Sequence, residues 1–226
     1  MPVSLLNLPP SGDWKHLNPL NYKFTMSLIH PIPHPDFHPV IFLPDEIELY
    51  DFSQEYDPNR QPLSPFVVGK YNEHRPNMYK GDLFEQDART VHVGIDIGCP
   101  AETPIHAFET GRIVHQGYNP EPFDYGHVMV TEHQQINGQT VWVLWGHLSK
   151  KSISRRTIGT SFKKGDVLGW VGDKSENGGW NPHLHIQLSR TCPDTHDMPG
   201  VVSLKNRAQA LFQYPDPRIV LGQIYQ

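Results

Sequence analysis

The strongest constraint on the fold is a series of short runs between Val91 and Leu188, in which apolar and polar residues alternate and which glycines separate. Because successive side chains of a strand point to opposite faces, each run predicts a strand with one buried face. The runs predict strands at residues 91–97, 111–116, 127–133, 140–148, 167–171 and 183–188, with turns at Asn137-Gly138 and Lys164-Gly165. We therefore expect a mainly β fold with antiparallel strands.

The N-terminal third is crowded with prolines, which discourage helices and central strands. It also carries too many aromatic residues for a solvated tail, namely Phe24, Phe37, Phe42, Tyr50, Phe52, Tyr56 and Phe66. We predict that residues 1–75 form an extended, proline-rich strap, with a short strand at 47–52, packed on a main domain of residues 76–198.

The remaining residues, 199–226, carry one helical pattern. Ser203 is a suitable cap, and Leu204, Ala208, Leu211 and Phe212 fall on one face of the helix that would follow. Prolines at 215 and 217 would end it. We predict a C-terminal tail with a single short helix.

Composition excludes several classes of protein. A formal charge of -5 and no dense run of Lys and Arg argue against nucleic acid as a partner. The sequence contains no stretch of about 18 apolar residues, so we expect no insertion into a membrane. Residues 1–16 lack the features of a secretory signal, so we expect a cytoplasmic protein, or an extracellular or periplasmic one if a leader was removed. Cys99 and Cys192 are expected as two buried thiols, with a single bridge as the alternative.

Two of the predicted strands carry potential metal ligands. Alternation places His92, Gly94 and Asp96 on one face of the first strand, and Gly94 leaves room for an ion to approach. The same rule aligns His183, His185 and Gln187 on the last strand. Imidazole and carboxylate are the ligands that zinc takes in catalytic sites, three from the protein and one from water. Either motif alone is expected about once by chance, but together, with His147 between them, they predict a zinc site.

These residues carry a resemblance to a known family. His92-x-x-x-Asp96, Gly146-His147-Leu148-Ser149 and Pro182-His183-Leu184-His185 occur in the order and context of the lysostaphin-type (LytM-like) zinc metalloendopeptidases. Supporting stretches lie at 98–105, 110–114 and 164–172, so the resemblance covers about residues 90–188 and leaves out the strap and the tail.

The resemblance implies a fold, a metal and a reaction. The fold is a compact antiparallel β-sandwich or barrel-sandwich hybrid with a groove over one sheet. One Zn²⁺ per chain would be held by His92, Asp96 and His185, with His147 and His183 as catalytic residues beside the open position. Such an ion lowers the pKa of its bound water to about 7 and polarises the scissile carbonyl. His147 and His183 would move protons or stabilise the oxyanion, and the sequence does not divide these roles between them.

The substrate is less constrained. The family generally cuts peptide cross-links of cell walls, so a peptide or peptidoglycan fragment is the expected partner. This chain, however, reads Asn177-Gly178-Gly179-Trp180-Asn181-Pro182 where relatives commonly carry a Ser/Thr-Gly turn, and Trp180 would narrow the groove, stack on substrate or simply pack. The alternatives are a peptide- or glycan-binding module that does not hydrolyse, an intracellular hydrolase of other amides, and, least favoured, a biotinyl- or lipoyl-type carrier.

Other histidines are weaker candidates. His30, His34 and His38 recur at a spacing of four, but the prolines among them forbid the helix that would align them. The strap is a better candidate for covering the groove than for binding a metal on its own. A strap in that position would donate a fourth zinc ligand, and the enzyme would then be latent. Tyr125 and His127 are expected to be structural.

Overall fold

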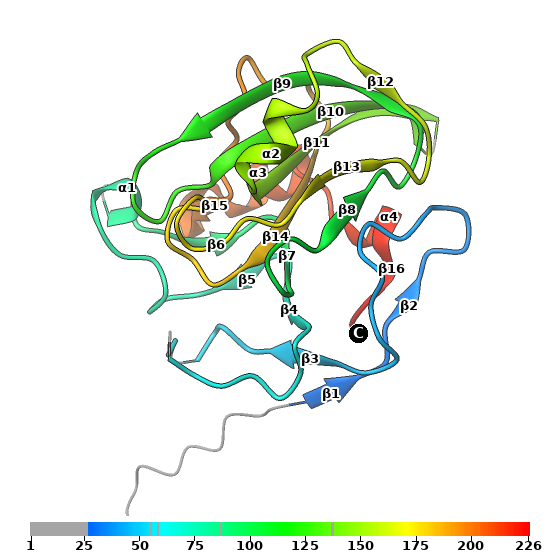
Figure 1. Cartoon of the computed structure of the whole chain (residues 1–226). Coiled ribbons are helices and arrows are strands. Elements are labelled where there is room, and N and C mark those ends of the chain that lie inside the picture. The colour runs from blue at the N-terminus through cyan, green and yellow to red at the C-terminus, as the bar shows by residue number, and fades with distance from the viewer. Residues whose placement is uncertain (1–26, 55, 58, 86, 137) are drawn as a thin grey trace, which may run out of the picture.

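The computed structural model describes residues 27–54, 56–57, 59–85, 87–136 and 138–226. Its main element is a nine-stranded sheet in the order β1-β3-β4-β7-β14-β11-β10-β9-β12 (Figure 1). The strands are β1 Ser27–Ile29, β3 Ile47–Tyr50, β4 Val67–Gly69, β7 Ile95–Gly98, β14 His183–Ser189, β11 Gln139–Leu148, β10 Gly126–Ile136, β9 Gly111–Asn119 and β12 Ser161–Phe162. The predicted mainly β fold is confirmed.

One pair makes the sheet mixed rather than purely antiparallel. β3 and β4 run parallel, whereas the other neighbours in this sheet are antiparallel. Parallel neighbours need a long crossover connection, and residues 51–66 supply it. This crossover lies in the strap, where the sequence pattern predicted a strand at 47–52 and no partner for it.

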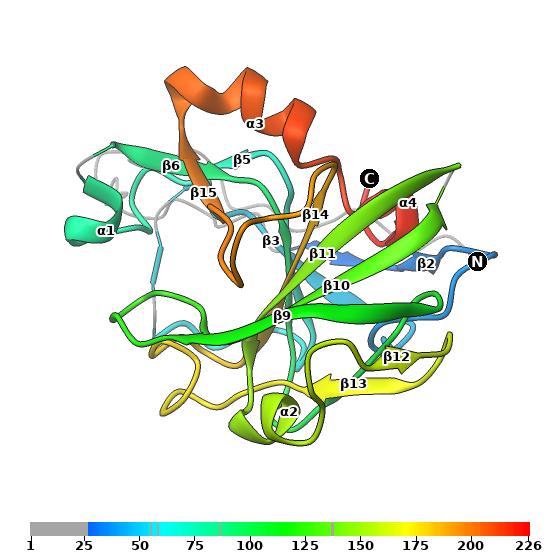
Figure 2. The ribbon, with the colours of Figure 1, turned by 90° about the horizontal axis from the view of Figure 1, so that it is seen from above.

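Smaller elements surround the main sheet. Three further sheets pair β8 Pro104–His106 with β13 Val167–Trp170, β6 Arg89–His92 with both β5 Glu73–His74 and β15 Val201–Ser203, and β2 Ile32–Pro33 with β16 Gly222–Gln223. The helices are α1 Asp82–Glu85, α2 Lys150–Ser154, a 3-10 turn Leu204–Asn206, α3 Arg207–Gln213 and α4 Arg218–Leu221. Seen from above, α3 lies beside β6 and β15, and α2 lies beside β13 at the other side of the molecule (Figure 2).

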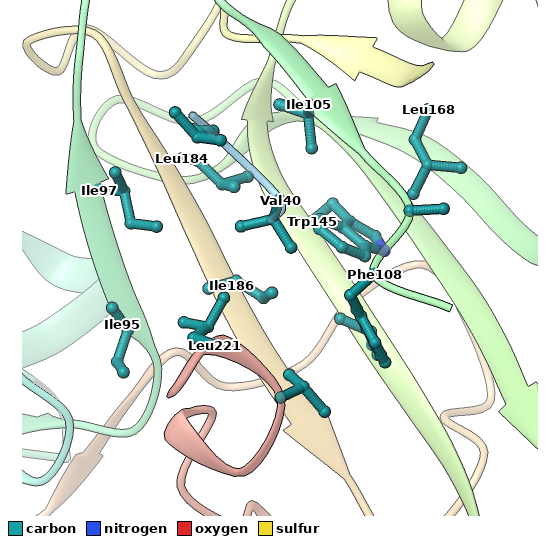
Figure 3. Packing of buried hydrophobic residues seen from close by; sticks show 14 of the residues in the cluster. Val40, Ile95, Ile97, Ile105, Phe108, Trp145, Leu168, Leu184, Ile186 and Leu221 are labelled. Atoms are coloured by element: carbon teal, nitrogen blue, oxygen red, sulfur yellow. The ribbon is translucent and has the colours of Figure 1, made fainter. Parts of the chain in front are cut away.

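The larger hydrophobic cluster lies on one face of the main sheet, and a smaller one, with Val128, Val130 and Leu144, lies on the other face of β10 and β11. Ile95 and Ile97 of β7 pack beside Leu184 and Ile186 of β14, and Trp145 of β11 continues the layer (Figure 3). All five are fully or almost fully buried. On β7 and β14, the buried Ile95, Ile97, Leu184 and Ile186 alternate with the polar residues, as the sequence pattern predicts, so the opposite faces of these two strands are left for polar side chains.

The prediction of one strand at 91–97 is wrong, because the structure divides this segment between two strands. Residues 89–92 form β6 of a small sheet, and 95–98 form β7 of the main sheet. Between them the Val93 amide donates to the Gly200 carbonyl over 3.0 Å. A Cβ at Gly94 would clash with the ring of His185. Gly94 is therefore needed for the approach of a side chain, and the room that we expected for an ion is taken by His185.

The other predicted strands are present with changed ends. β9, β10 and β11 are longer than predicted, and β13 ends at Trp170, after which Val171 forms an isolated bridge with Leu148. Gly165 has φ +84° in the predicted turn at 164–165. In the other predicted turn, Gly138 has φ +76°, and Asn137 lies outside the described residues.

The C-terminal tail differs from the prediction of one helix. α3 ends at Gln213, before Pro215 as predicted, but Pro217 starts α4, a role that suits proline because its φ is already helical. The predicted apolar face is confirmed at Leu211 and wrong at its other three positions. Leu204 and Phe212 are 53% and 74% exposed, and Ala208 is also exposed, because the helix packs on Val91 and Val93 through Ala210 and Leu211. Ser203 makes no side-chain cap.

The strap extends the main sheet over its described part, residues 27–75. β1, β3 and β4 form the edge beyond β7, and β2 pairs with β16 near the C-terminus (Figure 1). Phe37 packs edge-on to Phe108 at 5.5 Å between ring centroids, whereas Phe42 is 62% exposed. Phe24 and the prolines before it lie outside the described residues.

Two further expectations concern the cysteines and the membrane. Cys99 and Cys192 are both free thiols, but only Cys99 is buried, because Cys192 falls in the loop that follows β14. Throughout the described ranges, no helix has both the length and the apolar character needed to cross a membrane.

Candidate active site

Three side chains from three strands converge on one point. His92 ends β6, Asp96 lies in β7, and His185 lies opposite Asp96 in the register of β14. His92 Nε2 is 3.1 Å from His185 Nδ1 and 3.2 Å from Asp96 Oδ1, and His185 Nδ1 is 3.0 Å from the same carboxylate oxygen. The division of the predicted strand at Gly94 brings His92 to this point from a second sheet.

The hydrogen bonds of the two histidines determine which ring nitrogen faces the cluster. His92 Nδ1–H donates to the Lys70 carbonyl at 2.9 Å, which can only accept. His185 Nε2–H donates to Gln187 Oε1 at 3.1 Å, and the amide nitrogen of Gln187 donates to a backbone carbonyl, which fixes its orientation. Two imidazole lone pairs therefore face each other beside the Asp96 carboxylate. This arrangement is repulsive unless a cation lies between them, so the donor set fits a divalent metal ion.

A buried arginine holds the second oxygen of the carboxylate. Arg75 Nη1 donates to Asp96 Oδ2 at 2.8 Å and to the Tyr79 hydroxyl at 3.0 Å, and Arg75 Nε donates to Glu73 at 2.9 Å. Burial favours the neutral acid, but the neighbouring His92 ring and the Arg75 guanidinium outweigh it and hold the pKa of Asp96 well below its usual value. Burial, followed by the charge of Arg75, lowers the pKa of His92 to about 4. A neutral imidazole and an ionised carboxylate are the forms that bind a metal.

Two further histidines stand beside the cluster. His147 Nδ1–H donates to the Asn177 carbonyl at 2.9 Å, and His183 Nδ1–H donates to the Asn181 carbonyl at 2.7 Å, so each Nε2 is the free atom. The two rings are 4.2 Å apart, and His183 Nε2 is 4.0 Å from Asp96 Oδ1. Burial lowers the pKa of both, so both are neutral near pH 7 and able to accept a proton.

The backbone at His147 is in a left-handed conformation, with φ +60°. Such a conformation is costly for a residue other than glycine and is retained where the surroundings enforce it. Here the His147 amide donates to the Tyr125 carbonyl at 3.1 Å, and its carbonyl accepts from the Gly172 amide at 2.8 Å. The enforced conformation places the ring beside His183.

Four aromatic rings form a chain across the site. Trp180 is packed edge-on to Phe123 and to Tyr79, with centroids 5.2 and 6.4 Å apart, and Tyr79 contacts Phe84 at 5.0 Å. The indole N–H of Trp180 donates to the Phe123 carbonyl at 3.0 Å, and the residue is only 8% exposed. Trp180 therefore narrows the groove by packing, and it offers little open face for stacking.

Tyr125 and His127 were both expected to be structural. The Tyr125 hydroxyl donates to the Met198 carbonyl at 3.1 Å, but its ring lies 5.2 Å from that of His185 and lines the site. His127 is buried against the ring of Tyr118. Of the two, only Tyr125 borders the metal cluster.

The sequence missed three contributors to the site, which are Arg75, Gln187 and the Lys70 carbonyl. Gln187 carried a signal, because alternation puts it on the face of His183 and His185. The strap contributes Lys70 and Arg75 behind the ligands. Among the described residues, His92, Asp96 and His185 are the one group of three or more possible metal ligands, so neither the strap's fourth ligand nor a cluster of His30, His34 and His38 is found there.

Residues 90–197 match the model of Peptidase family M23. The chain is 30% identical over 100 residues to lysostaphin of Staphylococcus simulans, which covers 43% of this chain and 18% of lysostaphin. It is 30% identical over 99 residues to the glycyl-glycine endopeptidase ALE-1 of Staphylococcus capitis, which covers 42% of this chain and 24% of that protein. The chain thus spans a quarter or less of these relatives.

Solved structures of other proteins also align with part of this chain. The catalytic domain of a mutant of the prophage-encoded M23 protein EnpA from Enterococcus faecalis aligns with a TM-score of 0.43 and 26% identity, over 62% of this chain and 89% of that one. The catalytic domain of lysostaphin from Staphylococcus simulans aligns with a TM-score of 0.42 and 22% identity, over 59% and 89% of the two chains.

Proposed function

We propose that this chain, whose residues 90–197 match the model of Peptidase family M23, is a zinc-dependent endopeptidase that hydrolyses peptide bonds in peptidoglycan-type cross-link peptides. The observation that carries the proposal is the convergence of His92 Nε2, His185 Nδ1 and Asp96 Oδ1 within 3.2 Å of one another, with each second donor atom already engaged.

The metal would be held by His92, Asp96 and His185, one ion per chain. When bound, zinc acidifies water and polarises the scissile carbonyl. Lys70, Gln187 and Arg75 orient the three ligands from behind, and such outer contacts raise metal affinity by fixing ring and carboxylate positions.

His147 and His183 would perform the proton transfers. Each is neutral and presents its Nε2 while its Nδ1–H is fixed to a carbonyl. One imidazole accepts the proton of the attacking water and returns it to the leaving amine. The other, whose Nε2 also carries a lone pair, accepts a hydrogen bond from the attacking water and orients it.

The substrate proposal draws on the relatives. One is named a glycyl-glycine endopeptidase, and lysostaphin is the other. The expected partner is therefore a peptide or a peptidoglycan fragment, bound along the groove that contains the metal ligands.

Metal content and turnover in two variants test the proposal. The wild-type protein should contain about one zinc per chain and cleave purified cell-wall fragments or glycine-rich peptides. His185→Ala should lose the metal, and His147→Ala should keep it and lose turnover by a factor of about 100 or more. Wild-type turnover in His147→Ala would rule out the mechanism.

A second candidate is a binding module that uses the same groove without hydrolysis. The contact between Tyr79 and Trp180 supports it, because these rings restrict access to the ligands. Zinc-loaded protein that binds peptides and never cleaves them would favour this alternative.

A further inference from the structure

Two cavities of very different size adjoin the metal ligands. The first, lined by His92, His147 and His185, has a volume of about 90 Å³. The second has a volume of about 710 Å³. Sites for small organic ligands usually measure about 300–1,000 Å³. The first cavity therefore admits only a narrow segment of substrate, whereas the second is large enough for a bulky side chain.

The two cavities meet at the reacting centre. Both are lined by Met78, Asp96, Trp180 and His183. A peptide whose scissile bond lies at Asp96 and His183 must continue in two directions from that point. One direction leads into the narrow cavity and the other into the large one, so the two sides of the scissile bond meet different steric limits.

The walls of the large cavity are mostly apolar. Phe52, Tyr56 and Pro62 line it from the strap, and Pro100 and Pro182 line it from the opposite side. Phe52 and Tyr56 are only partly buried, so part of each ring faces accessible space. Burying an apolar side chain against such walls is worth about 25 cal/mol per Å² of area removed from water. The chemistry therefore suits a bulky apolar group.

The strap wall comes from the crossover between β3 and β4, outside the segment matched by the family model. It is held rigidly. The fully buried Glu48 forms an ion pair with Arg60 and accepts the Leu63 amide at 2.7 Å, and the Arg60 guanidinium lies 4.3 Å from the centre of the Tyr50 ring. A wall fixed before binding avoids the entropy cost of ordering it around a ligand.

We propose that this cavity is a specificity subsite, which takes a bulky apolar side chain of the substrate peptide on one side of the scissile bond. The inference rests on the proposed peptidase function. It predicts that this protein prefers peptides with one bulky apolar residue over peptides made of glycine alone. The narrow cavity accepts a small residue on the other side of the bond.

Paired peptides test the proposal. Fluorogenic peptides of otherwise constant sequence would carry glycine or phenylalanine on either side of the scissile bond, and kcat/KM would be measured for each. Phenylalanine on one side should raise kcat/KM at least tenfold over glycine, and phenylalanine on the other side should lower it. Glycine preferred on both sides would overturn the proposal.

Variants locate the effect. Tyr56→Ala should remove most of the preference for phenylalanine, measured as the ratio of kcat/KM between the phenylalanine and glycine peptides. Gln61→Trp, which adds bulk at the cavity lining, should lower the same ratio. Tyr118→Ala is the matched control, because Tyr118 lies on β9, is 48% exposed and lines neither cavity. Equal preference in Tyr56→Ala and Tyr118→Ala would contradict the proposal.

A binding measurement separates this proposal from the peptidase function. Calorimetric titration of the zinc-loaded His147→Ala protein with the same peptides should show tighter binding of the phenylalanine peptide, lost when Tyr56→Ala is added. That result without cleavage by the wild type would refute the peptidase function and keep the subsite. Cleavage by the wild type, with no difference in binding or in kcat/KM between the peptides, would refute the subsite and keep the peptidase.

Discussion

Arg75 of the strap donates a 2.8 Å hydrogen bond to Asp96 Oδ2, while the other oxygen of that carboxylate faces His92 and His185. Arg75 is fully buried, and its guanidinium lies 4.4 Å from the centre of the Phe52 ring. A residue outside the family-matched segment thus positions a proposed metal ligand and connects it to the wall of the large cavity.

Replacing Arg75 should weaken the metal site. Arg75→Met frees Asp96 Oδ2 and leaves Lys70 as the one cation paired with Glu73, so zinc affinity, measured by competition with a chelator, should fall about 10- to 100-fold. The metal-free protein should lose about 3 kcal/mol of unfolding free energy, because two buried carboxylates lose the arginine that they share. Arg112→Met removes an exposed ion pair with Glu132 and serves as the control. Equal zinc affinity in the two variants would contradict the role given to Arg75.

The hydrogen bond from His185 to Gln187 should matter for the same reason. Gln187 is fully buried, and Gln187→Met keeps its approximate size while removing the acceptor for His185 Nε2–H. The ring is then free to turn or change tautomer, so zinc affinity should fall about tenfold, with the fold kept as judged by circular dichroism. Unchanged affinity would show that Gln187 does not orient His185.

Removing the strap distinguishes a supporting from an inhibitory role. A chain without residues 1–75 lacks the Lys70 carbonyl and Arg75, and its β7 loses its β4 neighbour. We propose that the strap (1–75), the main domain (76–198) and the tail (199–226) form one folding unit, so the shortened chain should lose zinc and turnover. A rise in turnover would instead support the latent enzyme, in which the strap blocks the groove.

Stability should fall in acid through a histidine far from the metal. Burial lowers the pKa of His133 to about 4. Between this value and the unfolded pKa of 6.5, the unfolded chain binds a proton that the folded one does not, so stability is full above pH 6.5 and falls as the pH drops toward 4. The loss is about 3 kcal/mol from this group.

Comparing variants isolates the contribution of His133. Its Nε2 bonds the Thr131 hydroxyl at 2.9 Å, and its ring stacks on Phe108. The unfolding free energy is measured by urea titration at pH 7 and at pH 4. Its decrease between these two pH values should be about 3 kcal/mol smaller in His133→Gln than in the wild type. His30→Gln, at a side chain that is 74% exposed, should follow the wild type. Parallel pH curves for wild type and His133→Gln would be inconsistent with this explanation.

Alternation accounts for most of what the sequence predicted correctly. It placed Ile95, Ile97, Leu184 and Ile186 in the core and left Asp96, on the other face of its strand, free to meet His185. Such a pattern is local, and local patterns survive folding when one face of each strand is buried.

What the sequence could not predict depends on contacts between distant segments. The break after His92 follows from the approach of the His185 ring to Gly94, which no window around residue 94 contains. Arg75 lies in a stretch without periodicity, and its role appears only once β4 lies beside β7. The tail helix buried Ala210 instead of Phe212 because the position of β15 decides which face it presents to Val91.

Diffraction from zinc-loaded crystals on both sides of the zinc absorption edge tests the central claim most directly. The account predicts one anomalous peak per chain, about 2.0–2.2 Å from His92 Nε2, His185 Nδ1 and Asp96 Oδ1. Zinc-loaded crystals with no peak at these three atoms, or with zinc held by other residues, would contradict it.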